Sequence, residues 1–246
     1  MQQPNPSPVA LITGAARRVG RAIALRLADA GFDIAFTYLS SITDAQTLTT
    51  EIQGKSRRCL AISADLTDPA TATETIGQKF TESFDRLNVL VNNASLYAPS
   101  ALDQTDLPQM RRFWSIHVES PLLLCRAFAP TLRKNSGHII NMVDLLAERP
   151  WPQYLSYCTS KAGLWNLTLG LARELAPEVT VNGIAPGVAE WAPGTSEDEK
   201  KNYLKRVPLN RAGTPTDIAE AIHYLCTTGS YITGQILRVD GGRSIT

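Results

Sequence analysis

A strand, a glycine turn and a helix open this chain, and no other stretch limits its possible folds as strongly. Residues 8–12 form a short apolar run without helical periodicity, which predicts a buried strand. The turn 13–20 follows, where Gly14 permits a tight bend, and a helical pattern covers 21–30. In such a unit the helix N-terminus faces the pyrophosphate of a dinucleotide. The spacing is not G-x-G-x-x-G, so a loop without a ligand is the alternative.

Strand and helix patterns alternate along the rest of the chain. This alternation indicates an α/β fold with one doubly wound (Rossmann), mostly parallel sheet and helices on both faces. With 246 residues and 43% apolar content, we expect a single domain over 1–246, with a flexible tail at 1–7. Further strands are predicted over 33–38, 58–63, 88–92, 138–142, 179–184 and 236–239, and helices over 43–53, 69–84, 107–134, 154–175 and 216–226.

Composition excludes several classes of partner. The 24 Lys and Arg residues balance 23 Asp and Glu residues, so no strong field attracts nucleic acid or an anionic membrane. No apolar stretch approaches the roughly 18 residues that a bilayer requires. The four cysteines are scattered without C-x-x-C spacing and are best interpreted as reduced thiols. We therefore expect a cytoplasmic protein with no nucleic-acid partner, no membrane association and no metal site.

Tyr157 and Lys161 are four residues apart in the helical stretch 154–175, so their side chains leave the same face of the helix. A phenol has an unperturbed pKa of about 10, too high for easy proton transfer at neutral pH. An ammonium group one turn away favours the phenolate and should lower the pKa of Tyr157, which makes it a candidate general acid or base. Such a pair is common by chance, and an ordinary surface helix face is the alternative.

Five motifs in this order resemble those of the short-chain dehydrogenase/reductase family. They are Thr13-Gly14-x5-Gly20, Asn92-Asn93-Ala94-Ser95, Tyr157-x3-Lys161, Ala185-Pro186-Gly187 and Asp240-Gly241-Gly242. The resemblance covers nearly the whole chain and implies a nicotinamide cofactor, with the region 188–206 carrying a mobile substrate loop. It implies these cofactor-binding residues: Gly14, Arg17, Arg18, Val19, Ser40, Asp65, Leu66, Asn93, Ala94, Tyr157, Lys161, Pro186, Gly187 and Val188.

The cofactor is predicted to be NADPH. Enzymes that use NADH usually carry an acid at the end of the second strand, about 20 residues beyond the glycine turn, whereas this chain reads Phe36-Thr37-Tyr38-Leu39-Ser40-Ser41. Arg17 supplies the charge that a 2′-phosphate requires, and serine hydroxyls can donate to it. An unliganded surface role is the alternative for Arg17. Asp65 is either an adenine contact or a turn former, and one residue can serve both roles.

Three departures from the common family pattern resemble the pteridine reductases and dihydromonapterin reductases. Asp144 stands where most members place a catalytic serine, Ser95 replaces a glycine, and Arg18 replaces the middle glycine of the turn. This resemblance implies hydride transfer to a C=N bond of a pterin or folate, with Asp144, Tyr157 and Lys161 as catalytic residues. The substrate-binding residues that it implies are Arg18, Ser95, Tyr97, Asp144, Tyr157 and Trp191.

Two residues keep open interpretations. Tyr97 either stacks on the pterin, since offset stacking suits a flat heterocycle, or packs within its own loop. His117 occupies the family's usual asparagine position, whose backbone carbonyl holds a water that bridges to the lysine. A histidine there either preserves that relay or simply packs within a long helix.

Two other functions compete with the pterin hypothesis. A carbonyl reductase of 3-oxoacyl thioester type fits the same family, although an ionised Asp144 would repel a developing alkoxide. A non-catalytic NADPH-binding regulator is disfavoured by the intact Tyr157 and Lys161. The family resemblance further implies a homotetramer that buries the helices 107–134 and 154–175, with Arg243 approaching a neighbour's active site.

Overall fold

Seven parallel strands form one sheet in the order β3-β2-β1-β4-β5-β6-β7, in a computed structural model that describes residues 7–192 and 194–246. The predicted fold class is confirmed, and each predicted strand is found within two residues of its expected bounds. The strands are β1 (Val9–Ile12), β2 (Asp33–Tyr38), β3 (Cys59–Ser63), β4 (Val89–Asn92), β5 (His138–Met142), β6 (Thr180–Pro186) and β7 (Ile236–Val239). Most of the tail expected at 1–7, and position 193 of the expected loop region, lie outside the described residues.

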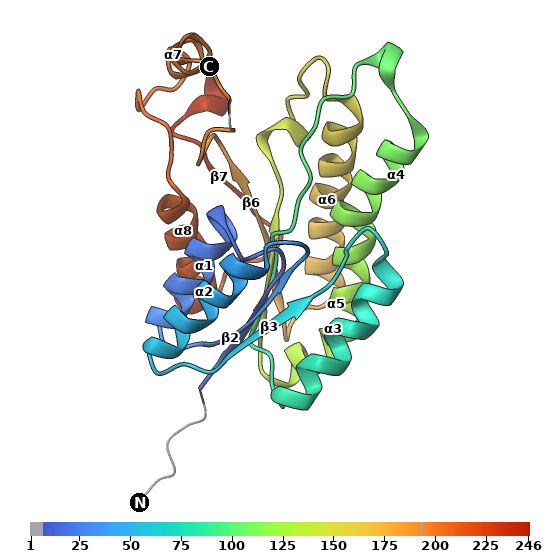
Figure 1. Ribbon diagram of the computed structural model, residues 1–246, viewed down its shortest axis with the longest axis vertical. Helices are drawn as coiled ribbons and strands as arrows, with labels where there is room; N and C mark the ends of the chain where they lie inside the picture. Colours follow the sequence, from blue (N-terminus) through green and yellow to red (C-terminus); the bar gives the residue numbers. More distant parts are fainter. Residues whose placement is uncertain (1–6, 193) are drawn as a thin grey trace, which may run out of the picture.

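Helices cover both faces of this sheet, with α1, α2 and α8 on one side and α3, α4, α5 and α6 on the other (Figure 1). The long helix predicted over 107–134 is corrected, because a π-helical turn, η2 (Ser115–Glu119), separates two α-helical parts. The helices are α1 (Arg18–Asp29), α2 (Ile42–Gly54), α3 (Pro69–Ser83), α4 (Leu107–Trp114), α5 (Ser120–Lys134), α6 (Leu155–Glu174), α7 (Glu197–Leu204) and α8 (Pro215–Thr227). Shorter turns are η1 (Leu102–Gln104), η3 (Leu145–Ala147) and η4 (Arg243–Ile245).

The sheet separates two hydrophobic cores. Alternate strand residues point to opposite faces, so Ala10 and Ile12 join one core while Val9 and Leu11 join the other. The first core is completed by side chains of α1, α2 and α8, the second by side chains of α3, α5 and α6. Burial on both faces explains why these strands are continuous apolar runs. The site residues lie near the carboxyl ends of these strands.

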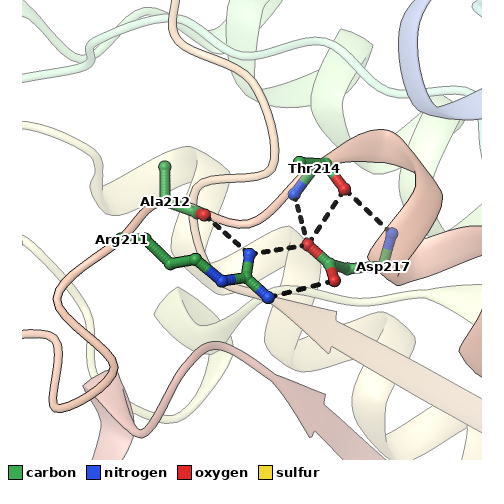
Figure 2. A network of polar contacts seen from close by, with 4 residues as sticks. All are labelled: Arg211, Ala212, Thr214 and Asp217. Atoms are coloured by element: carbon green, nitrogen blue, oxygen red, sulfur yellow. Dashed lines mark hydrogen bonds and ion pairs between the residues drawn. The ribbon is translucent and has the colours of Figure 1, made fainter.

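The start of α8 is held by a network of polar contacts (Figure 2). The Thr214 hydroxyl accepts a hydrogen bond from the Asp217 amide, and the Asp217 carboxylate accepts from the Thr214 amide, which forms a capping box. Arg211 donates two hydrogen bonds to the same carboxylate, at 2.9 and 3.2 Å. This anchor matters because α8 packs along α1, the helix that begins at the glycine turn.

None of the helices in the described ranges is both long and apolar enough to cross a membrane. Among the same residues, no group of His, Cys, Asp and Glu side chains is arranged to hold a metal ion.

Candidate active site

A cleft of about 1500 Å³ opens at the carboxyl ends of the strands. It includes the point between β1 and β4 where the strand order reverses, the usual ligand site of doubly wound sheets. Every residue assigned above to catalysis, cofactor or substrate lines this cleft: Gly14, Arg17, Arg18, Val19, Ser40, Asp65, Leu66, Asn93, Ala94, Ser95, Tyr97, Asp144, Tyr157, Lys161, Pro186, Gly187, Val188 and Trp191. The role of each residue stays a prediction.

The glycine turn is locked against the end of β4. Asn93 Nδ2 donates to the carbonyl oxygens of Thr13 and Gly14, at 2.9 and 3.1 Å. Gly20 has no room for a side chain, because a Cβ there would lie 2.6 Å from Asn93 Nδ2. The first turn of α1 carries no acidic residue, and no side chain of the part of the chain that the structure describes caps its N-terminus. This open helix end suits the pyrophosphate of a dinucleotide.

Arg17 lies at the mouth of the cleft with an exposed side chain. Its Nε is 3.7 Å from Asp44 Oδ2, on the first turn of α2. Asp44 was missed by the sequence analysis, which considered acids only at the end of β2. Exposed ion pairs contribute little free energy, so Arg17 can exchange this partner for a phosphate. Ser40 is exposed nearby in the same cleft.

Arg18 connects the glycine turn to the substrate-loop region. Its guanidinium lies 3.3 Å from a carboxylate oxygen of Glu190 and donates to the Glu190 backbone carbonyl at the same distance. The φ angle of Arg18 is +55°, the left-handed conformation in which glycine is usual, so the residue adopts the backbone of the glycine that it replaces. Asp65 accepts hydrogen bonds from the Thr67 amide and hydroxyl, so it serves as the turn former.

Asp144, Tyr157 and Lys161 meet at the end of β5. The Tyr157 hydroxyl donates to Asp144 Oδ2 at 2.6 Å, and Asp144 Oδ1 accepts from the Leu146 amide at 2.8 Å. Lys161 Nζ donates to the Met142 carbonyl at 2.8 Å and lies 5.8 Å from the Tyr157 ring centre. Tyr157 is 3% and Lys161 2% exposed, whereas Asp144 is half-buried, so the acid–base cluster is largely withdrawn from solvent.

The electrostatics of this cluster correct one expectation. Burial raises the pKa of Tyr157 well above its usual value, and the neighbouring Asp144 raises it further, so the predicted lowering by Lys161 is wrong for the chain alone. Burial also raises the pKa of Asp144, against the hydrogen bonds from Leu146 and Tyr157 and the charge of Lys161. Burial lowers the pKa of Lys161 to about 8, while Asp144 opposes this shift.

Aromatic side chains form the walls above the catalytic cluster. Tyr97 is 49% exposed; its ring stacks on Tyr154 at 4.8 Å and meets Tyr157 edge to face at 4.9 Å. One face of Tyr97 is therefore occupied within the protein, and only the other can meet a ligand. Trp191 packs edge to face on Tyr203, with ring centres 5.5 Å apart.

Several lining residues were not assigned to this cleft by the sequence analysis, which placed Arg243 at a neighbour's active site and did not name the others. The Tyr203 hydroxyl accepts from the Val188 amide at 3.0 Å, which ties α7 to the loop after β6. Arg243 lines the cleft of its own chain, with its guanidinium carbon 5.7 Å from the Tyr203 ring centre. Arg149 and Arg206 line the same cleft. No motif marks Arg149, Tyr203 or Arg206 in the sequence, because only the fold brings them together with Arg243 of η4.

Comparisons with known proteins support the family that the motifs indicate, but they do not support the predicted pteridine reductase branch. The family model described as Enoyl-(Acyl carrier protein) reductase matches residues 14–244. A Staphylococcus aureus 3-oxoacyl-[acyl-carrier-protein] reductase FabG is 35% identical over 95% of this chain and 96% of its own. A Synechocystis 3-oxoacyl-[acyl-carrier-protein] reductase is 33% identical, again over 95% of this chain and 96% of its own.

Solved structures extend the likeness to the fold. Acetoin dehydrogenase from Enterobacter cloacae superposes with a TM-score of 0.89 at 31% identity, covering 98% of this chain and 96% of that one. A Serratia marcescens short-chain dehydrogenase/reductase mutant gives a TM-score of 0.90 at 32% identity, covering 96% and 98%. The relatives named here carry no pterin-reducing name, so the comparisons lend no support to the pteridine reductase branch. They show that this chain is an oxidoreductase belonging to the short-chain dehydrogenase/reductase family.

Proposed function

We propose that the chain is an NADPH-dependent reductase that transfers hydride to a C=N bond of a pterin or folate, such as a dihydropteridine. The observation that carries this proposal is the partly buried hydrogen bond that the Tyr157 hydroxyl donates to Asp144. Reducing a ring C=N bond places a hydride on carbon and requires a proton at the adjacent ring nitrogen. A carboxyl group paired with a phenol in a desolvated cleft is suited to hold and deliver that proton.

The cleft fits a dinucleotide on two features of its own. The uncapped N-terminus of α1 offers backbone amides to a pyrophosphate, and Gly20 leaves no side chain in the packed turn. Arg17 would meet the 2′-phosphate, and Lys161 keeps N–H groups beyond its bond to Met142 for ribose hydroxyls. When bound, the dihydronicotinamide supplies the hydride, while this chain's residues orient the ligands and manage the proton.

The proton path follows from the hydrogen bonds. In the described arrangement the Tyr157 hydroxyl donates to Asp144, so its proton points at the carboxylate. If Asp144 is protonated, its O–H donates to the phenol oxygen instead, and the Tyr157 proton becomes free for a substrate nitrogen. The raised pKa of Asp144 favours this second arrangement. Asp144 thus acts as the proton reservoir and Tyr157 as the donor that contacts substrate.

Reduction of a 3-oxoacyl thioester is the second candidate, and the comparisons favour it over the first. Relatives 33–35% identical over nearly the whole chain carry that activity in their names. Tyr157 and Lys161 would serve a ketone equally well, since an alkoxide also requires one proton. Asp144 is the residue that this candidate leaves unexplained, because a carboxylate repels a developing oxyanion.

The deciding experiment is NADPH oxidation by the purified enzyme with a dihydropteridine, dihydrofolate and an acetoacetyl thioester, measured side by side. The first candidate requires kcat/KM for a pterin or folate to exceed that for the thioester. The reverse order establishes the second candidate. Tight NADPH binding without turnover of any substrate would instead support a regulatory role.

We also propose a homotetramer. Apolar side chains are exposed along the outer layer formed by α4, α5 and α6, which supports burial of this face against another copy: Met110, Trp114, Leu122, Leu155 and Leu169. Light scattering after gel filtration at micromolar concentration measures the mass. A monomer would refute the proposal.

A further inference from the structure

His117 links the loop after β4 to the catalytic helix α6 through two serine hydroxyls. Its Nε2 is 2.8 Å from Ser95 Oγ, and its Nδ1 is 2.8 Å from Ser160 Oγ. The ring is 1% exposed and stacks on Phe113, with ring centres 5.9 Å apart. Both ring nitrogens thus have defined partners, and the imidazole sits in a fixed orientation between the cleft and the helix.

The partners determine where the ring carries its proton. The Leu96 amide, which can only donate, lies 3.3 Å from Nε2, so Nε2 accepts. The Ser160 hydroxyl donates its single proton to the Tyr157 carbonyl at 2.7 Å, so its oxygen accepts from Nδ1. These two independent constraints agree on a neutral ring protonated at Nδ1. Burial and the charge of Lys161 both lower the pKa of His117, which keeps the ring neutral.

The same assignment fixes the direction of the Ser95 hydrogen bond. An unprotonated Nε2 accepts from the Ser95 hydroxyl, whose only other acceptor within residues 7–192 and 194–246 is the more distant Leu96 carbonyl oxygen, at 3.3 Å. The proton of Ser95 is therefore directed into the protein. Ser95 is exposed and lines the cleft, so its oxygen offers lone pairs alone to a ligand.

We infer that His117 is a positioning residue that fixes Ser95 as a hydrogen-bond acceptor, so that the cleft selects substrates presenting an N–H or NH₂ donor at Ser95. The inference rests on the proposed function for its natural ligand, since an aminopteridine edge carries such donors. A 3-oxoacyl carbonyl only accepts, so it gains nothing from this oxygen. Selection of this kind works by leaving a polar group unpaired when the wrong ligand binds.

The ring proton is tested directly by ¹⁵N NMR of the enzyme with NADP⁺ bound, at neutral pH. The chain has only three histidines, and the spectrum of His117→Asn identifies the His117 signals. We expect a neutral ring protonated at Nδ1. A ring protonated at Nε2, or at both nitrogens, would overturn the inference. If His117→Asn folds poorly, Ser95→Ala gives a second assignment, because it should shift the Nε2 signal of His117. The wild-type spectrum then reports the protonation of the His117 ring.

Selection is tested by a double-mutant cycle on turnover of a 2-amino dihydropteridine. Ser95→Ala and His117→Asn should each raise KM by about tenfold, the scale of one hydrogen bond, with kcat within about twofold. Because His117 acts through Ser95, the double variant should match Ser95→Ala alone. A purely structural histidine would give additive losses and a reduced kcat, and that result refutes the inference.

Failure of the proposed function would be seen first, as a wild-type enzyme that reduces no dihydropteridine. The inference then makes a separate demand on acetoacetyl thioester reduction. His117→Asn should then change this KM only as far as Ser95→Ala does, because His117 acts on the ligand only through Ser95. A KM that rises further in His117→Asn than in Ser95→Ala would contradict the inference.

Discussion

Tyr157 donates a 2.6 Å hydrogen bond to Asp144 across the turn that ends β5, where Tyr157 is buried and Asp144 is half-buried. Lys161 lies one helical turn away but contacts the Met142 carbonyl rather than either partner. The phenol and the carboxyl therefore share one proton site in a low-dielectric environment, with the ammonium acting at a distance. This arrangement makes residue 144 the position that separates the two candidate activities.

Replacing Asp144 by serine should lower kcat for a dihydropteridine by about 10²-fold, the scale of losing a general acid. Pterin binding should weaken much less, because Asp144 acts behind Tyr157. Steady-state NADPH oxidation gives kcat, and ligand titration gives affinity. Asp144→Asn, which keeps the shape but cannot exchange a proton, should lose a similar factor. A serine variant that reduces pterins normally would remove the main support for the pterin proposal.

Activity should fall as pH rises through about 8, the pKa to which burial lowers Lys161. Below that pH the ammonium is charged and can hold a ribose hydroxyl, whereas above it the charge is lost. The profile of kcat/KM should therefore show a one-proton loss on its alkaline side. The Lys161→Arg variant stays charged throughout this pH range. Its activity should be lower than that of the wild type but should not fall on the alkaline side. A wild-type profile that stays flat to about pH 10 would contradict the assignment.

Gly20→Ala should destabilise the protein by about 1–3 kcal/mol, the range for overpacking. The added Cβ would lie 2.7 Å from Ala15 Cα and Gly14 O, backbone atoms that cannot move cheaply. Gly77→Ala on α3 is the matched control, since among the described residues no atom beyond its own stretch of helix lies within 4 Å of its Cβ position. That helix substitution should stabilise by about 0.5–1 kcal/mol. Urea unfolding of both variants measures the two changes in the free energy of unfolding. Equal changes would contradict the prediction that Gly20 is overpacked by a Cβ.

The fold was predictable because its signals are local. Strands buried on both faces are continuous apolar runs, and a parallel sheet brings their carboxyl ends to one edge. Residues that directly follow strands, such as Asp65, Asn93 and Asp144, therefore reach one cleft without any long-range information. The predicted roles of the substrate-binding residues came from family resemblance and await functional tests.

What escaped prediction depends on contacts between distant segments. The pKa of Tyr157 was expected to fall because the sequence displays Lys161 on the same helix face, but it hides the burial and the Asp144 contact that raise it. The π-helical turn at Ser115–Glu119 shifts the helix register by about one residue, which apolar periodicity does not resolve. The Arg18–Glu190 pair joins segments that only the fold brings together.

Asp217→Asn should lower the free energy of unfolding by about 1 kcal/mol at neutral pH, the usual value of a helix cap. The hydrogen bond from Arg211, followed by those from Thr214, lowers the pKa of Asp217 to about 2. A depressed pKa stabilises the fold above the unfolded value of 3.8, and this stabilisation is lost as pH falls through about 2. The difference between wild type and variant should therefore shrink below about pH 4. Urea unfolding at several pH values measures it, with Asp198→Asn on α7 as the control for removing an acid from a first turn. A difference independent of pH would exclude the charge as its cause.

Arg17→Ala should weaken NADPH binding about 10- to 100-fold while leaving NADH binding nearly unchanged, because only NADPH carries the 2′-phosphate that the guanidinium would hold. The pairing of Arg17 with Asp44 adds a second requirement. Asp44 holds the guanidinium in the free enzyme, at 3.7 Å, and its carboxylate would repel a phosphate placed beside Arg17. Asp44→Ala should therefore leave NADPH binding unchanged or make it tighter, most clearly at low salt, where exposed charges interact most strongly. Fluorescence titration of the wild type and both variants with the two cofactors gives the six dissociation constants. Equal losses for NADPH and NADH in Arg17→Ala would show that Arg17 does not recognise the phosphate. Weaker NADPH binding in Asp44→Ala would instead mean that Asp44 positions the guanidinium for the cofactor rather than competing with it.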